Sequence, residues 1–161
     1  MTDKAATLRE LDEAWAALRS LVDSLAEQEL AAPGVVDAWS VKDLLGHMAF
    51  WAQKAADDLR LLTDGRESEI QTPGSEQGVD EWNARESERR KGLDLAAVTA
   101  EWQRGHEAAR RALEAVAPER LDVEVKGWSM ARRFGEDTYV HYREHADQIR
   151  AWQRQRETSE T

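Results

Sequence analysis

The feature that most constrains the fold is an apolar stripe that recurs at spacings of three and four residues in four long segments. The first of these segments spans residues 3–30. Its stripe consists of Leu8, Leu11, Trp15, Leu18, Val22 and Leu25. This period is that of one face of an α-helix. Runs of β-branched residues are absent, and the nearest approach to a strand is the short alternating stretch 121–125. The chain is therefore predicted to be all-α.

Two further helices are marked by residues that begin and end them. Ser40 is a good N-cap with Asp43 three residues later, a variant of the capping box, and predicts a second helix that ends at residues 63–65. Asp94 caps a third long helix, and Pro118 ends it.

The remaining segments complete a single domain over residues 1–161. A fourth helix is predicted over 129–154, and a frayed tail over 157–161. Residues 63–80 are polar and hold three glycines and a proline, which predicts a long surface loop between the second and third helices. A short helix around 81–91 can follow this loop. Four long amphipathic helices in one chain of this size predict a four-helix bundle.

Charge and cysteine content exclude several classes of function. Lys and Arg number 22 and Asp and Glu number 32, which gives a net charge of −10. We therefore expect no binding to nucleic acid or to an anionic membrane surface, since both need a cationic face. No run of apolar residues is long enough to span a membrane. The chain has no cysteine, which excludes disulfides and thiolate ligands, and its start lacks the apolar core of a signal peptide. These features together predict a cytoplasmic protein.

The informative residues are polar side chains on faces that should be buried. His141 and His145 are four residues apart on the fourth helix, with Phe134 and Trp152 on the same face. Both imidazoles should therefore point at the core, where this spacing lets them converge on one metal ion. A single buried histidine is more often satisfied by a core hydrogen bond. Two stacked histidines favour a metal, because a charge on either would repel the other in a poorly solvated site.

A third ligand must come from another helix. Only His47 and His106 remain. His47 lies at the margin of the stripe of the second helix, and His106 lies on or near the inner face of the third. The helical angle alone does not choose between them and, if anything, favours His106.

Two segments, 39–51 and 141–152, resemble the DinB/YfiT superfamily of metal-binding four-helix bundles. The Gly-Trp-Ser and Pro-Glu-Arg-Leu turns also resemble the ClbS/DfsB branch. Members carry one histidine on the second helix and a His-x3-His pair on the last long helix. The resemblance implies that His47, His141 and His145 bind a divalent metal, zinc or nickel, and that His106 is structural or lines a pocket.

The resemblance also implies a reaction class. The superfamily includes mycothiol-dependent maleylpyruvate isomerase and enzymes that transfer mycothiol or bacillithiol. We therefore expect a metal-dependent enzyme that transfers a low-molecular-weight thiol to a small electrophile or hydrolyses it, with a thiolate or an activated water as the reacting group. Many members look dimeric, so a homodimer is expected.

One alternative is a non-catalytic protein that sequesters a small molecule or protects against stress. Another is a bundle that only mediates assembly, with ordinary core histidines.

Other residues near these histidines carry weaker signals. Glu144 completes an H-x-x-E-H sequence, the inverted zinc-protease motif, but too little chain follows to supply the further carboxylate ligand of such an enzyme. We expect Glu144 to be a rim carboxylate or to contact a metal ligand. Trp51 lies one turn after His47 and is either a core residue or the wall of a substrate pocket. Asp58 and Asp137 could each orient a histidine, although solvated edge positions are favoured for both.

Overall fold

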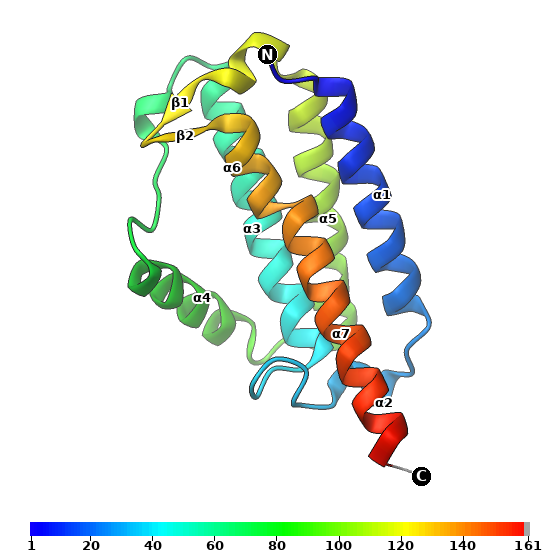
Figure 1. Cartoon of the computed structure of the whole chain (residues 1–161). Coiled ribbons are helices and arrows are strands. Elements are labelled where there is room, and N and C mark those ends of the chain that lie inside the picture. The colour runs from blue at the N-terminus through cyan, green and yellow to red at the C-terminus, as the bar shows by residue number, and fades with distance from the viewer. Residues whose placement is uncertain (160–161) are drawn as a thin grey trace.

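The computed structural model describes residues 1–159, and its architecture is a bundle of four long helices (Figure 1). These helices are α1 (Lys4–Asp23), α3 (Val41–Thr63), α5 (Leu95–Ala115) and α7 (Tyr139–Ser159). Their inward faces form one apolar core. The predicted all-α bundle is confirmed. None of the described helices is both long and apolar enough to cross a membrane.

The first predicted helix is broken, so its assignment as one helix over residues 3–30 was wrong. Helix α1 ends at Asp23, and the short helix α2 (Glu27–Ala31) follows. The Ser24 hydroxyl donates to the Leu21 carbonyl at 2.6 Å, and the Glu29 carboxylate accepts from the Ala26 amide at 2.8 Å. These two contacts satisfy backbone or capping groups at a helix end and a helix start, so the break costs little.

Helices α3 and α5 form the closely packed centre of the bundle. The Ser40 hydroxyl accepts from the Asp43 amide and the Asp43 carboxylate accepts from the Ser40 amide, as the sequence predicted. At Gly105 on α5, an added Cβ would lie 2.8 Å from the Ala49 carbonyl oxygen of α3. Only glycine allows the two backbones to approach this closely.

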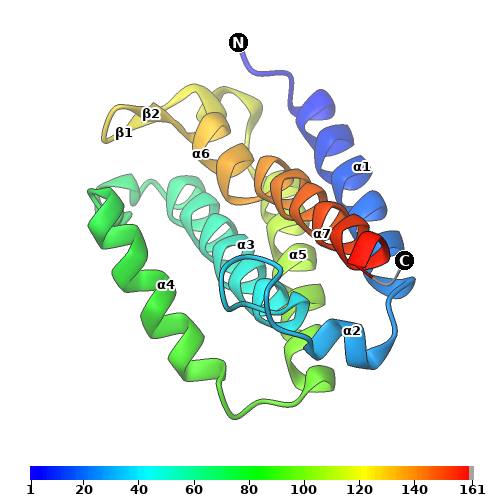
Figure 2. The same ribbon diagram turned by 60° about the horizontal axis from the view of Figure 1, so that its bottom comes forward.

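The long loop predicted at 63–80 is shorter than expected. It holds a 3₁₀ turn, η1 (Glu67–Glu69), and ends where α4 (Glu76–Arg90) begins at the N-cap Ser75. Helix α4 has no buried residue and lies beside α3, apart from the other long helices (Figures 1 and 2). Its C-terminal end is fixed by Arg90, whose Nε lies 2.7 Å from a carboxylate oxygen of Glu101 on α5.

The C-terminal region differs from prediction in two ways. A 3₁₀ turn, η2 (Pro118–Asp122), and a two-stranded hairpin, β1 (Glu124–Val125) and β2 (Trp128–Ser129), come before the last helices. The predicted helix 129–154 is two helices, α6 (Met130–Asp137) and α7, because the backbone leaves the helical region at Thr138 (φ −128, ψ −98).

Residues 157–159 of the predicted frayed tail are helical in the structure. Helix α7 continues to Ser159, and the hydroxyls of Thr158 and Ser159 donate to carbonyls four residues earlier, at 2.8 and 2.9 Å. Residues 160–161 of that prediction lie outside the described residues.

Candidate metal centre

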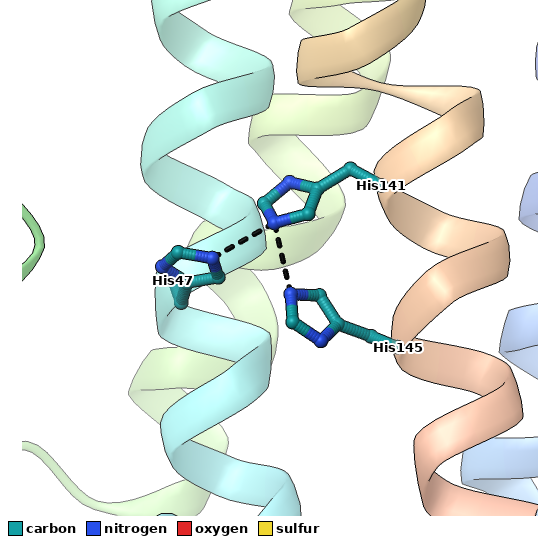
Figure 3. Close-up of side chains that lie close together, drawn as sticks. All are labelled: His47, His141 and His145. Atoms are coloured by element: carbon teal, nitrogen blue, oxygen red, sulfur yellow. Dashed lines mark hydrogen bonds between the residues drawn. The ribbon is translucent and has the colours of Figure 1, made fainter. Parts of the chain in front are cut away.

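Three histidines from two helices meet in one cluster, hereafter the histidine cluster: His47 on α3 and His141 and His145 on α7 (Figure 3). The Nε2 atom of His141 lies 2.8 Å from Nε2 of His47 and 2.8 Å from Nε2 of His145. One ligand nitrogen from each ring lies within 4.8 Å of the others. The structure therefore brings together the three residues that the family resemblance implied.

Burial keeps these imidazoles neutral. It is the largest cause that lowers the pKa of His47, to about 3, with the nearby His145 and Arg90 lowering it further. Burial also lowers the pKa of His141 well below its ordinary value, with the two neighbouring histidines adding to the effect. The pKa of His145 is lowered by burial as well. At neutral pH all three rings therefore have a free lone pair on one nitrogen.

Neutral rings cannot satisfy one another in this arrangement. A given nitrogen of a neutral imidazole either carries a hydrogen or offers a lone pair. Since Nε2 of His141 faces both other rings at 2.8 Å, at most one of these two contacts is a full two-centre hydrogen bond. If all three lone pairs were directed at a divalent cation, the rings would no longer need to hydrogen-bond to one another. Zinc–nitrogen bonds of about 2.0–2.1 Å in tetrahedral geometry would separate the nitrogens by about 3.3–3.4 Å, so the two pairs that include His141 would need to widen only slightly.

The chemistry of the donor set thus fits a metal ion. Three neutral imidazoles suit borderline divalent metals, zinc and nickel among them. Three protein ligands leave a coordination position for another molecule, which is the pattern of catalytic metal sites.

Gln148 supports this cluster and was missed by sequence analysis. Its Oε1 lies 2.6 Å from Nδ1 of His145. Glu144, in contrast, is exposed, and within residues 1–159 it makes no hydrogen bond to the cluster. Its charge raises the pKa of His145 against the larger effect of burial. The spacing of three residues on one helix was the only sequence signal for Gln148.

His106 does not join the cluster, although the helical angle had favoured it. It is buried in the core, where its ring stacks on Trp15 with centroids 3.9 Å apart and planes 3° apart. Its Nδ1 lies 3.4 Å from the Tyr142 hydroxyl. Burial lowers the pKa of His106 to about 4. This histidine packs as a structural core residue.

A cavity of about 530 Å³ opens beside the cluster and is lined by His47 and His141. Trp51 forms part of its wall, and the Trp51 indole Nε1 donates to Oδ1 of Asn83 on α4 at 2.9 Å. Loop residues 72–75 and the β1–β2 hairpin enclose the cavity further out.

Two aspartates line this cavity: Asp137 is half-buried, whereas Asp58 does not occupy the solvated edge that the sequence favoured. Asp58 is 3% exposed, and its carboxylate lies 2.5 and 2.6 Å from Nζ of Lys54 rather than beside a histidine. Burial raises the pKa of Asp137 to about 7, with Asp58 adding to the effect. The cavity therefore holds a carboxyl group whose pKa lies well above the ordinary value for aspartate.

A second cavity, of about 620 Å³, is lined by His47 and His145. Glu144 lies at its rim, and the carboxylates of Asp80 and Glu88 on α4 also face it. The histidine cluster thus lies between two cavities, and α4 contributes a wall to each.

The fold and the histidine cluster are those of a DinB/YfiT-like bundle, and the sequence comparison agrees. Residues 11–156 match the family described as the mycothiol maleylpyruvate isomerase N-terminal domain. Because the match spans most of the chain, this protein belongs to that family. A search of the curated proteins finds no match.

Two solved structures share the fold. An uncharacterised protein from Escherichia coli UTI89 is 16% identical with a TM-score of 0.79, over 96% of this chain and 94% of that one. The colibactin self-resistance protein ClbS, crystallised in complex with a dsDNA, is 12% identical with a TM-score of 0.80, over 93% of this chain and 94% of that one. At these identities the likeness shows the fold alone.

The ClbS complex corrects one expectation drawn from composition. We had excluded nucleic acid as a partner because of the net charge of −10. A protein of this fold crystallised with dsDNA contradicts that exclusion. Net charge averages over a whole surface, whereas binding depends on local groups. In this chain, for example, the Arg132 and Arg133 guanidinium groups lie 4.0 and 5.9 Å from the ring centroid of the half-exposed Trp128.

Proposed function

We propose that this protein is a metal-dependent enzyme that transfers a low-molecular-weight thiol to a small electrophile, or hydrolyses that electrophile. The observation that carries the proposal is the convergence of three neutral imidazoles whose Nε2 atoms cannot satisfy one another. His47, His141 and His145 would hold the ion, with zinc or nickel the best match to the donor set.

The chain supplies no thiol of its own, so a thiol must come from a cosubstrate. A divalent metal ion bound by three histidines would lower the pKa of a thiol or a water molecule. The family's name includes mycothiol, which makes mycothiol the first thiol to examine.

The chain's own residues provide the surroundings for two reactants. Trp51 gives one cavity an apolar wall suited to a substrate, and the cavity on the other side of the cluster leaves room for a second molecule. Asp137, with a pKa raised to about 7, can take up or release a proton inside the first cavity. Glu144 is expected to act only as a charge at the rim of the second.

The proposal is tested by a turnover assay on zinc- and nickel-loaded protein. Mycothiol, bacillithiol and cysteine are each incubated with a panel of small electrophiles, and thiol loss and products are followed by mass spectrometry. We expect turnover with at least one pair or hydrolysis without thiol, lost in His141→Ala and retained in His106→Phe. A fully loaded protein without turnover in any combination would contradict catalysis.

A second candidate function is protection by sequestration, favoured by the fold shared with a protein named for self-resistance. In that case one small molecule binds stoichiometrically and is released unchanged. The same assay separates the two functions, and titration with a DNA duplex tests whether dsDNA binding extends to this chain.

We also propose a cytoplasmic homodimer. Light scattering on the purified protein tests the dimer, and cell fractionation tests the compartment.

A further inference from the structure

We propose that Gln148 is a positioning residue that sets the tautomer of His145 and so presents its Nε2 lone pair to the metal. The inference rests on the proposed metal site. Oε1 of Gln148 lies 2.6 Å from Nδ1 of His145, closer than the histidine nitrogens lie to one another.

An amide oxygen only accepts hydrogen bonds, so this contact requires a hydrogen on Nδ1 of His145. A neutral imidazole, the form that binds a metal, carries a single N–H. With that hydrogen on Nδ1, Nε2 carries the lone pair. Nε2 is also the atom that faces His141 and lies in the cluster.

Among residues 1–159, no other hydrogen bond of His145 fixes which nitrogen carries the hydrogen. The 2.8 Å contact between Nε2 of His145 and Nε2 of His141 is compatible with either ring as the donor. A neutral histidine that lacks a partner at Nδ1 tends to carry its hydrogen on Nε2, where it would block the ligand atom. Gln148 therefore decides which nitrogen of His145 is free, as carbonyl and carboxylate acceptors do for ligating histidines elsewhere.

The Gln148 contact acts on His145 alone among the three proposed ligands. The Gln148 side chain reaches His145 because both lie on α7, three residues apart. Glu144 is a poorer candidate for this role, since it is exposed and makes no hydrogen bond to the three rings within the described chain. Loss of Gln148 should thus affect His145 and leave the fold intact.

The test uses three variants: Gln148→Met, which keeps the length and removes the acceptor; Gln148→Glu, which can only accept; and Gln155→Met, a matched change on the exposed part of the same helix. Two-bond ¹H–¹⁵N spectra of the metal-free protein at pH 7 read the tautomer of His145, and competition with a chelator measures zinc affinity. We expect Nδ1–H in the wild type, Gln148→Glu and Gln155→Met. In Gln148→Met the hydrogen should move towards Nε2, with zinc affinity lower by about ten- to a hundredfold.

Two outcomes would overturn the inference. One is Nε2–H in the wild type, which would mean that the Gln148 amide donates to His145, or a loss of Nδ1–H in Gln148→Glu, which would mean that an acceptor at this position does not set the tautomer. The other is an unchanged tautomer in Gln148→Met. If the tautomers behave as expected but the wild type binds no zinc or nickel, the positioning role of Gln148 stands and the metal-dependent function fails.

Discussion

The molecule contains two kinds of buried histidine, and they differ in how their neighbours satisfy them. His106 lies in the core, stacked on Trp15 with Tyr142 as its hydrogen-bond partner. In the histidine cluster each ring instead faces another imidazole, and His141 faces two at 2.8 Å. The contacts of the first environment do not call for a ligand, whereas a cation would satisfy the second. Burial alone therefore does not mark a functional histidine; the partners do.

The largest expected difference between the two environments is in metal affinity. His47→Ala removes a ligand, and His106→Phe removes none. Structural zinc sites are stabilised by about 10–16 kcal/mol over four ligands, or about 2.5–4 kcal/mol per ligand, so zinc affinity should fall roughly a hundred- to a thousandfold in His47→Ala. Competition with a chelator measures this. Equal affinities in the two variants would erase the distinction between cluster and core.

The next largest effect concerns stability against pH. Because the pKa of His106 is lowered to about 4 from 6.5, the unfolded chain binds a proton there first as the pH falls. The contribution of His106 to the free energy of unfolding is fully present above about pH 6.5 and is lost as the pH falls to about 4. At about 1.4 kcal/mol per pKa unit, the total loss is about 3 kcal/mol. Urea unfolding of the metal-free protein at pH 7 and pH 4 should show His106→Phe losing less stability than the wild type, by about this amount. Identical losses would mean that His106 is not held neutral by the core.

A smaller effect is expected on the local stability of α4, where Asn83 contacts Trp51. The Trp51→Phe change removes the indole N–H that donates to Asn83 and keeps an aromatic wall. One lost hydrogen bond corresponds to about 1 kcal/mol, so amide exchange in α4 should become roughly fivefold faster. Exchange in α5, around His106, serves as the internal control. Equally faster amide exchange in both helices would indicate that the whole protein is destabilised and not α4 alone.

The smallest effect is expected at Glu144. This carboxylate is exposed, and its interaction with His145 is screened by solvent. Glu144→Gln should change zinc affinity by less than about threefold. A loss comparable to that in His47→Ala would show that the H-x-x-E-H sequence carries a role that the described structure does not give it.

Helices could be predicted where caps and apolar stripes mark them within one or two turns. Breaks could not be predicted where the same residues are compatible both with a helix and with its end. The caps at Ser40 and Asp94 and the four apolar stripes depend on residues within one or two turns. The breaks after Asp23 and at Thr138 were missed, because serine and threonine there bond to carbonyls within the preceding turn, a pattern that helices also tolerate. The length of α4 was missed for a related reason, since its polar sequence has no apolar stripe to follow.

The site shows the same limit at the level of tertiary structure. Periodicity alone placed His141 and His145 together on one face. The third histidine depends on how α3 and α5 are rotated against α7, which no spacing along the chain reports, and the family resemblance supplied it. Gln148 and Asn83 gave no signal that could be separated from ordinary polar surface residues.

The central claim, that the histidine cluster binds a metal and His106 does not, is tested most directly by elemental analysis. The untagged wild type is measured by plasma mass spectrometry beside His141→Ala, with and without added zinc or nickel. The account predicts about one metal ion per chain in the wild type and none in the variant. A wild type that holds no metal even after supplementation, or a variant that retains a full ion, would contradict it.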